Sequence, residues 1–268
     1  MDRSLGCPIC SAALEVAFSA TVLRRHAVRY LSCGSCGLLK AESPFWLEEA
    51  YQSAIVESDT GVAQRSLRYR RLLEPVLYTF FGEKGTYLDL AGGYGLLTRL
   101  MRDIGFDCYT TDRFCQNLLA RGFEPREAFR ADALFAFEVL EHVENPVSFL
   151  ADAFSLYGCR TLIFTTLTFS GAAPPRDWWY YGFEHGQHVT FYQPRTLMKL
   201  ATLLEARYFP ISADTHLFTD RPLSWKWTLL LKHAQTRRLY AAWVRLKRRN
   251  LSKTWDDLLL VKNAPNRH

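Results

Sequence analysis

The sequence of 268 residues lacks any apolar run that approaches the ~18 residues needed for a membrane-spanning helix. Its N-terminus also lacks the charged-then-apolar pattern of a secretory signal segment. The seven cysteines are an odd number, which fits a reducing compartment where cysteines serve as metal ligands or core residues rather than disulfides. These features together predict a cytoplasmic location.

A basic surface over the whole chain is lacking as well. Residues 221–268 hold 12 Lys/Arg and two Asp/Glu, a net charge of +10, so residues 1–220 carry a net −4 although the full chain is +6. A mildly acidic body argues against a nucleic-acid groove spread over the protein. The hydrophobic content of 49% is enough for a packed core and excludes a disordered or collagen-like chain.

Four of the seven cysteines form two Cys-x-x-Cys pairs that 22 residues separate: Cys7, Cys10, Cys33 and Cys36. Each pair can close a tight turn, and four thiolates in tetrahedral geometry suit Zn²⁺. Short strands are predicted between the pairs, at 14–18 and 28–31. Residues 1–42 are therefore predicted to form a zinc ribbon, whose closed site serves structure or recognition rather than catalysis.

A glycine-rich turn, Asp89-Leu-Ala-Gly-Gly-Tyr-Gly95, follows an apolar strand and precedes an amphipathic helix. Glycines let the backbone pass close to a ligand, and the helix N-terminus offers free N–H groups. The next predicted strand, 106–111, leads to Asp112, 17 residues after Gly95. At this position in a βαβ unit, an acidic residue can accept hydrogen bonds from both ribose hydroxyls. The alternative is that Asp112 is an ordinary surface residue after a strand.

Strands and helices continue to alternate up to residue 219. The predicted elements are a strand at 133–137, a helix at 146–157, a strand at 161–166, a helix at 194–206 and late strands at 208–212 and 216–218. This alternation predicts an α/β fold with a doubly wound, mostly parallel sheet. The predicted domains are the zinc ribbon 1–42, a helical connector 43–84, a cofactor-binding domain 85–220 and a basic, aromatic-rich helical extension 221–268.

The chain resembles the class I S-adenosylmethionine-dependent methyltransferases, which have a Rossmann-like fold. The glycine-rich turn, Asp112 and the segment Phe137-Glu-Val-Leu-Glu-His-Val143 carry this resemblance. More narrowly, the chain is similar to bacterial methyltransferases with an N-terminal zinc ribbon that are associated with cell-surface glycan or sugar modification. The stretches that carry the closer similarity are Asp59-Thr-Gly61, 115–123, Trp178-Trp-Tyr-Tyr181 and Gly186-Gln-His188. A nicotinamide-dependent enzyme is the weaker alternative, because the Glu-His segment would have no role in it.

The resemblance implies S-adenosylmethionine as the cofactor. It assigns Asp112 to the ribose, Phe137 and Glu138 to the border of the sulfonium, and the turn to the methionine part through Asp89, Ala91, Gly92, Gly93 and Gly95. The first glycine of the family's turn is Ala91 in this sequence. A methyl group is small, so we expect cofactor binding to survive this departure.

Methyl transfer from a sulfonium requires an aligned nucleophile and, for a hydroxyl or carbon acid, removal of a proton. Histidine suits the second task near neutral pH. The similarity to sugar C-methyltransferases that use a Glu-His pair implies His185 or His188 as the base and Glu184 as the residue that orients it. A purely orienting role of these histidines is the alternative. His142 is a third candidate, although Glu141 and His142, at the start of a helix, are expected rather to hold their own loop in place.

Four adjacent aromatic residues, Trp178-Trp-Tyr-Tyr181, are hard to bury together, which predicts a lid or a substrate wall. The segment 223–249 interleaves aromatic and aliphatic residues with basic ones at helical spacing. Packing of this helix on its own domain is the first expectation. Peripheral attachment to an anionic membrane, where lipid-linked sugars would be met, and contact with RNA phosphates are the alternatives.

The sequence thus predicts an S-adenosylmethionine-dependent methyltransferase with structural Zn²⁺ that acts on a small molecule or on a sugar of a cell-surface glycan. An RNA base methyltransferase is one alternative, because some ribosomal guanine methyltransferases also pair a zinc ribbon with this fold; nucleic acid is the less favoured partner. A degenerate, non-catalytic protein that only holds the cofactor is the other alternative, and Ala91 suggests it. The sequence does not fix the oligomeric state.

Overall fold

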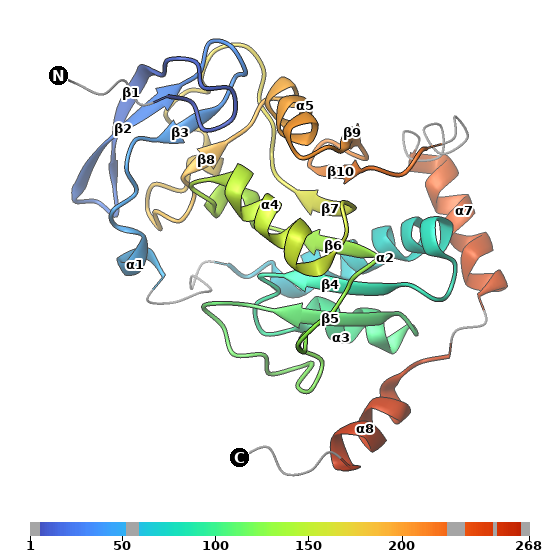
Figure 1. The fold of residues 1–268 in the computed structure, drawn as a ribbon. Coiled ribbons are helices and arrows are strands. Elements are labelled where there is room, and N and C mark those ends of the chain that lie inside the picture. The colour runs from blue at the N-terminus through green and yellow to red at the C-terminus, as the bar shows by residue number, and fades with distance from the viewer. Residues whose placement is uncertain (1–5, 52–58, 224–233, 249–250, 264–268) are drawn as a thin grey trace. The chain divides into compact units, whose positions relative to one another are not determined.

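The computed structural model describes residues 6–51, 59–223, 234–248 and 251–263 (Figure 1). The chain divides into two compact units, each built from two separate stretches of sequence: 1–56 with 136–222, and 57–135 with 223–268. The four consecutive domains predicted from the sequence do not coincide with these units. The reason is that the N-terminal ribbon folds together with a segment that lies more than 100 residues later in the chain.

The ribbon region of the first unit is a four-stranded antiparallel sheet in the order β1-β2-β3-β8. Its strands are β1 (Glu15–Val22), β2 (His26–Ser32), β3 (Leu39–Ala41) and β8 (Thr190–Phe191). The two strands predicted between the cysteine pairs are confirmed. β8 completes the sheet, with Leu39 opposite Phe191.

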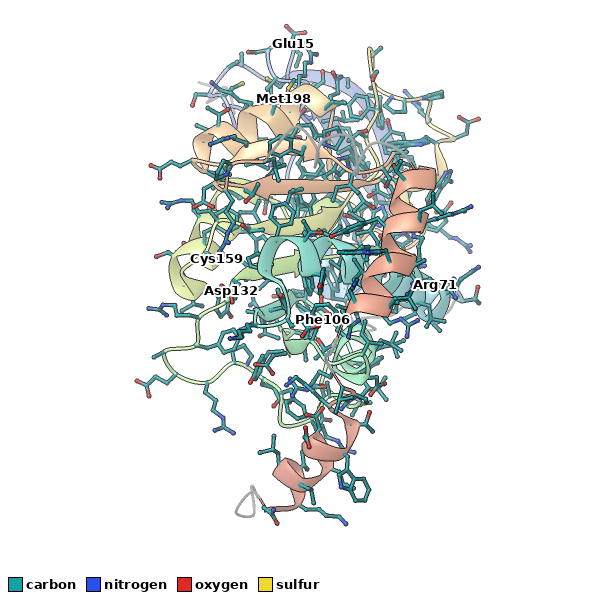
Figure 2. The ribbon with its side chains drawn as sticks, turned by 90° about the vertical axis from the view of Figure 1, so that its right-hand side faces the viewer. Glu15, Arg71, Phe106, Asp132, Cys159 and Met198 are labelled. Carbon is teal, nitrogen blue, oxygen red and sulfur yellow. The ribbon has the colours of Figure 1, made fainter. Side chains whose placement is uncertain are left out.

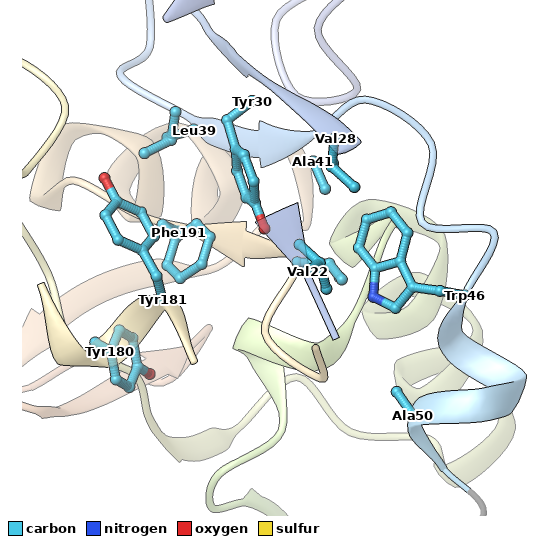
Figure 3. Close-up of a cluster of buried hydrophobic side chains, with 11 residues drawn as sticks. Val22, Val28, Tyr30, Leu39, Ala41, Trp46, Ala50, Tyr180, Tyr181 and Phe191 are labelled. Carbon is cyan, nitrogen blue, oxygen red and sulfur yellow. The ribbon is translucent and has the colours of Figure 1, made fainter. Parts of the chain in front are cut away.

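A hydrophobic core lies under this sheet, and Figure 3 shows most of its side chains. Tyr30, Trp46, Tyr180, Tyr181 and Phe191 are its aromatic members, and all are buried. The Trp46 indole, just before α1 (Leu47–Ala50), donates a hydrogen bond of 2.7 Å to the carbonyl of Gly186. This core therefore joins the ribbon to the loop before β8, since neither buries its apolar side chains alone.

The rest of the first unit carries the later helices and strands. They are η1 (Leu140–His142), α4 (Pro146–Tyr157), β7 (Leu162–Thr165), η2 (Trp179–Tyr181), α5 (Pro194–Leu203), β9 (Arg207–Pro210) and β10 (Thr215–Thr219). β10 pairs antiparallel with both β7 and β9, so the late strands are confirmed. The helix predicted at 146–157 has its predicted bounds because Asn145 caps it, Pro146 begins it and Gly158 ends it in a left-handed conformation.

The second unit holds the parallel strands. β4 (Thr86–Leu90) lies between β5 (Asp107–Thr111) and β6 (Ala133–Ala136) and is parallel to both; at Ala136 the chain passes into the first unit. α2 (Val62–Phe81) and α3 (Leu96–Asp103) pack against each other. Residues 112–132, all of which the structure describes, form neither helix nor strand. The predicted α/β fold with mostly parallel strands around the cofactor turn is confirmed.

The C-terminal extension contributes α7 (Ala234–Lys247) and α8 (Thr254–Asn263) to the second unit. Buried Glu74 of α2 accepts hydrogen bonds from Arg245 at 2.8 Å and from Arg248 at 2.7 Å. The Arg248 guanidinium also lies 4.7 Å from the ring centroid of Phe106, which Figure 2 labels. These contacts support packing of the tail on its own unit. Residues 224–233 of the predicted tail helix lie outside the described residues.

No helix in the described part of the chain is both long and apolar enough to cross a membrane.

Candidate functional site

The four cysteine sulfurs come together at the start of the first unit. The Cys7 and Cys36 Sγ atoms are 3.5 Å apart, and those of Cys10 and Cys33 are 3.4 Å apart. These separations are close to the edge of about 3.8 Å that a tetrahedron with Zn–S bonds of about 2.3 Å requires. The cluster therefore fits a structural zinc ion, as the spacing of the cysteines predicts.

The surroundings of this cluster favour a thiolate at Cys7, whereas burial raises the pKa of Cys33, and the bond to Cys7 together with burial raises that of Cys36. A hydrogen bond from the Cys36 thiol, together with the backbone amides of Ile9 and Cys10, lowers the pKa of the Cys7 thiol to about 5. The Cys36 amide points at the Cys33 sulfur at 3.5 Å. The Thr196 hydroxyl of α5 donates to the Cys36 carbonyl at 2.8 Å. The metal turn is thereby tied to a helix of the same unit.

The glycine-rich turn of the second unit follows β4, and hydrogen bonds link it to the residues at the end of β5. The Gly93 amide donates to Asp112 Oδ2 at 2.9 Å, and the amides of Phe114 and Cys115 donate to Asp112 Oδ1 at 2.7 and 2.8 Å. The Gly92 amide donates to the Thr111 carbonyl at 3.1 Å. The structure therefore brings the turn and Asp112 together, as the sequence predicts.

A cavity of about 380 Å³ opens beside this turn. Its lining comes wholly from the second unit: Gly93, Thr110, Thr111, Asp112, Cys115, Gln116, Asn117, Arg121, Gly122 and Glu124. The hydroxyl of Thr110 is buried, and in the described part of the chain it has no hydrogen-bond partner. A cavity with the Asp112 carboxylate and the Thr110 hydroxyl in its lining fits the nucleoside part of S-adenosylmethionine.

Gly92 is needed at this turn for reasons of space. A Cβ atom at Gly92 would lie 2.3 Å from Thr110 Oγ1 and 2.6 Å from Asp89 Oδ2, whereas one at Gly93 would meet nothing within 4 Å. Ala91 has a φ of +52°, in the left-handed region that costs an L-residue roughly 1–2 kcal/mol, and its side chain is exposed. The alanine at the family's first glycine position is thus accommodated sterically at a conformational cost.

We expect the substitution Gly92→Ala to weaken S-adenosylmethionine binding by roughly 5- to 150-fold, because overpacking by one methyl group costs roughly 1–3 kcal/mol and ~1.4 kcal/mol is tenfold in affinity. Titration calorimetry of the zinc-loaded protein measures this loss. Gly93→Ala is the matched control, since its methyl group has open space and only the positive φ of 58° opposes it. Equal affinities of the two variants would contradict the steric role of Gly92.

Asp89 is a buried carboxyl group at the end of β4. Its burial, and then the charge of Asp112, raise its pKa to about 8. An unfolded aspartate has a pKa of about 3.9, so between about pH 4 and pH 8 the folded protein holds a proton here that the unfolded chain does not. The contribution of Asp89 to stability is therefore fully present below about pH 4 and is lost as the pH rises through about 8.

We expect the cofactor-free protein to lose thermal stability between pH 6 and pH 8, by on the order of a few kcal/mol, and Asp89→Asn to remove most of this loss. Melting temperatures of both proteins at the two pH values measure it. Replacement of the exposed Asp152 by asparagine is the control and should keep the wild-type pH dependence. If the melting temperature of Asp89→Asn falls between pH 6 and pH 8 as much as that of the wild type, Asp89 is ionised in the folded state.

The loop after Asp112 is the part of this cavity that sequence reasoning missed. The Asn117 side chain donates to the Ala120 carbonyl at 2.7 Å and to Glu124 Oε1 at 2.6 Å, while its own oxygen accepts from the Ala120 amide at 2.9 Å. Glu124 Oε2 in turn accepts from the Gly122 amide at 3.0 Å. These bonds give the loop a fixed shape without secondary structure, so no helix or strand pattern could reveal it.

Phe137 and Glu138 directly follow β6 and belong to the first unit. Phe137 is buried and Glu138 is exposed, with a φ of +57°. The Glu138 amide donates to Thr165 Oγ1, and that hydroxyl donates back to Glu138 Oε1, both at 2.8 Å. The contact of these two residues with the sulfonium stays a prediction.

Three histidines of the first unit gather in one place. The ring centroids of His142 and His188 are 4.7 Å apart, and those of His185 and His188 are 4.9 Å apart. Glu184 is exposed. The buried acidic residue beside the cluster is Glu141, whose potential ligand atom lies within 4.8 Å of those of His142 and His188.

Backbone contacts define which ring nitrogens carry hydrogen. Nδ1 of His142 lies 3.1 Å from the Gln187 carbonyl, and Nδ1 of His188 lies 2.6 Å from the Tyr180 carbonyl. A carbonyl only accepts, so both Nδ1 atoms donate and each Nε2 carries a lone pair. The Gln187 amide instead donates to Nδ1 of His185 at 3.1 Å, so Nε2 of His185 holds the hydrogen. His142 and His188, not His185, therefore present basic nitrogens.

Burial keeps these two imidazoles neutral. It lowers the pKa of His142 to about 4, with a further contribution from His185, and it lowers the pKa of His188 well below its usual value. The sequence made His142 a candidate base but favoured a structural role for it. The only sequence signal for His142 and His188 as a pair was that His142 directly follows Glu141, an acidic residue that the His188 loop could approach.

The aromatic run divides between the core and the surface. Tyr180 and Tyr181 are buried, Trp178 is half-buried and Trp179 is 75% exposed. The Tyr180 hydroxyl accepts from the Leu167 amide at 3.1 Å. The predicted lid is thus wrong for the two tyrosines, because η2 turns them into the core, and only Trp179 offers a free aromatic face.

The fold and the turn define an α/β protein with a nucleoside-type cofactor cavity. Residues 63–205, a little over half of the chain, match the sequence model of a family described as a methyltransferase domain. The chain therefore belongs to this methyltransferase family, and the predicted class of S-adenosylmethionine-dependent methyltransferase is confirmed. No curated protein sequence matches the chain.

Several solved structures are similar to this chain at low sequence identity. A 1,6-didemethyltoxoflavin-N1-methyltransferase of Burkholderia thailandensis, with 1,6-didemethyltoxoflavin and S-adenosylhomocysteine bound, is 15% identical, with a TM-score of 0.48 over 75% of this chain and 97% of its own. The magnesium protoporphyrin IX methyltransferase of Synechocystis PCC 6803, with S-adenosylhomocysteine bound, is 14% identical, with a TM-score of 0.42 over 64% and 90%. CalO1, a methyltransferase in calicheamicin biosynthesis, is 15% identical, with a TM-score of 0.40 over 57% and 54%, so this chain spans about half its length.

Proposed function

We propose that this protein transfers the methyl group of S-adenosylmethionine to a hydroxyl group of a small molecule, with a sugar unit as the preferred acceptor. The observation that carries the proposal is the pair of neighbouring imidazoles, His142 and His188, whose Nε2 lone pairs are fixed by carbonyl contacts at Nδ1. A hydroxyl group is a poor nucleophile until its proton is bound elsewhere. Two neutral basic nitrogens in a methyltransferase supply that function.

The two halves of the reaction draw on different residues. Asp112 and the turn at Gly92 and Gly93 would hold the cofactor, which supplies an electrophilic methyl group when bound. His142 and His188 would bind and orient the acceptor hydroxyl through its proton, so that an oxygen lone pair is free for attack. His185, whose Nδ1 is occupied by the Gln187 amide, has a positioning role.

A sugar acceptor is supported by the exposed face of Trp179, which follows Arg176 and Asp177 in the same loop. An indole face packs against the C–H face of a sugar ring, while flanking charged groups bond to its hydroxyls. The resemblance to methyltransferases associated with surface glycans points in the same direction. That the acceptor sugar is part of a surface glycan, rather than a free or nucleotide-linked sugar, is also a proposal.

RNA is the less favoured acceptor because part of the basic tail is already paired. Arg245 and Arg248 share the buried carboxylate of Glu74, which leaves fewer cations for phosphates. The same pairing reduces the charge that the tail could offer to an anionic membrane. A purely non-catalytic role is disfavoured by the two oriented imidazoles.

The test is an assay of S-adenosylhomocysteine release with zinc-loaded protein, using a panel of nucleotide-linked sugars, free sugars, aromatic alcohols and RNA transcripts. Release with at least one hydroxylated small molecule, and slower release with Gly92→Ala at subsaturating S-adenosylmethionine, is the expected result. Methylation of RNA alone would replace the proposal by the nucleic-acid alternative. Binding of S-adenosylmethionine without turnover on any member of the panel would favour the non-catalytic alternative.

A further inference from the structure

Three potential metal-ligating atoms meet next to the ribbon sheet but outside the cysteine cluster. Glu141 and His142 are neighbours in η1, and His188 lies in the loop before β8. One ligand atom from each of the three residues lies within 4.8 Å of those of the other two. The Glu141 side chain is almost fully buried, with 1% of the residue exposed. A buried carboxylate is expected to be paired with a cation or a strong donor.

The two imidazoles are oriented as metal ligands are. A histidine that binds a metal through one nitrogen usually donates its other N–H to a carbonyl or carboxylate. His142 does so to the Gln187 carbonyl and His188 to the Tyr180 carbonyl. Each therefore offers Nε2 as an acceptor, and their rings stand edge to face at 86°. Two lone pairs and a carboxylate in one place repel one another unless a positive charge lies between them.

The backbone around the three ligands is held firmly. The Val189 amide donates to the Glu141 carbonyl at 2.8 Å, and the Thr190 hydroxyl donates to the Val143 carbonyl at 2.7 Å. The Tyr192 hydroxyl donates to the Leu140 carbonyl at 2.8 Å. These bonds join η1 to the segment after His188 on both sides of the cluster. The ligands are thus preorganised by their own unit, as a specific metal site requires.

We infer that Glu141, His142 and His188 bind a divalent first-row transition-metal ion such as Zn²⁺, Mn²⁺ or Co²⁺. Two imidazole nitrogens and one carboxylate form a donor set typical of such ions, whereas Mg²⁺ and Ca²⁺ prefer oxygen alone. Three protein ligands leave a position open for a further ligand, in contrast to the closed set of four thiolates.

The role of this ion rests on the proposed function. With the ion bound, the Nε2 lone pairs of His142 and His188 would coordinate it instead of accepting the hydroxyl proton. The acceptor oxygen would then occupy the open position, where the ion would lower the pKa of the hydroxyl and the proton would pass to solvent. The oxygen would then form a bond to the methyl carbon while the C–S bond breaks, so that the bonding electrons leave with S-adenosylhomocysteine. The binding of the ion itself does not depend on this step.

The experiment measures metal content of the full-length protein after loading with Zn²⁺ and extensive dialysis. We expect two ions per chain in the wild type and one in Glu141→Gln and in His188→Ala. His26→Ala is the matched control: His26 is a half-buried histidine of the same unit, paired with Glu49, and its removal should leave two ions. One ion in the wild type, or two in both cluster variants, would overturn the inference.

A second measurement guards against variants that fail to fold. Wild-type protein that holds Zn²⁺ in the cysteine cluster alone, at one ion per chain, is titrated with Co²⁺, and a visible d–d band that saturates at one equivalent, without the intense thiolate charge-transfer band, is expected. Absence of any band overturns the site. If the ion binds but no acceptor is methylated, the inference holds and the proposed function fails. If methylation proceeds with the cluster free of metal, the inference fails and the imidazoles act as bases directly.

Discussion

The substitution His188→Ala should lower turnover by roughly 10²–10⁴-fold, the range typical for loss of a group that handles the transferred proton. Nε2 of His188 carries a lone pair because Nδ1 donates to the Tyr180 carbonyl at 2.6 Å. Alanine removes that lone pair, whether it acts on the acceptor directly or through a bound ion. The measurement is the rate of S-adenosylhomocysteine release at saturating cofactor and acceptor.

Cofactor affinity is expected to stay within a few-fold of the wild type, because the residues that line the cofactor cavity come from the second unit and His188 from the first. Calorimetry checks this affinity, and the melting temperature checks the fold. The control is again His26→Ala, whose turnover should match the wild type. A His188→Ala enzyme with near wild-type turnover would remove this residue from the reaction.

The substitution Asp257→Ala should destabilise the protein by about 3–5 kcal/mol, the usual cost of leaving one member of a buried ion pair without its partner. Asp257 of α8 is 3% exposed and Arg102 of α3 is 2% exposed. The carboxylate accepts from Arg102 at 2.7 and 2.8 Å and from Arg99 at 2.9 Å. Without it, the Arg102 guanidinium stays buried over the ring of Phe123, at 3.6 Å from its centroid, and keeps only the partly exposed Asp107, at 2.9 Å, as an ion-pair partner.

Denaturant unfolding followed by circular dichroism measures this loss, and a melting temperature lower by on the order of 10 °C should accompany it. The neighbouring Asp256 is exposed, so Asp256→Ala should change stability by no more than ~0.5 kcal/mol. The double replacement of Arg102 and Asp257 by leucine should recover part of the loss, because it removes the buried guanidinium together with its buried carboxylate. Equal effects of Asp256→Ala and Asp257→Ala would show that the pair contributes little.

Much of the fold follows from local patterns that the sequence displays directly. The helix at Pro146–Tyr157 has an N-cap, a proline at its first position and a glycine after its last residue, and these signals act within a few residues. The zinc ribbon, and the closeness of Asp112 to the glycine-rich turn that begins at Asp89, likewise follow from the spacing of residues in the sequence. Fixed spacings work because a tight turn or a βαβ unit brings residues together whatever the rest of the chain does.

The histidine cluster could only be predicted in part. The sequence indicated His185 and His188 with Glu184 as their partner, yet Glu184 is exposed and the acidic neighbour is Glu141, 43 residues before it. The tautomers that distinguish His188 from His185 depend on a carbonyl at Tyr180 and an amide at Gln187. Such contacts arise from the path of one loop and have no signature in residue type or spacing. The same holds for the loop at Asn117, whose shape comes from its own side-chain bonds.

By itself the sequence determined the class of protein: no membrane-spanning run, a mildly acidic body, paired cysteines for zinc and a glycine-rich turn followed by an acidic residue. These features are local, so the chain encodes them within about 30 residues each. Tertiary structure decided how the distant parts are used. It places β8 beside β3 in the ribbon sheet, neutralises buried Glu74 and Asp257 with arginines from opposite ends of the second unit's sequence, and unites Glu141, His142 and His188. Burial is the physical reason, because a charge or lone pair inside a protein must find its partner across space rather than along the chain.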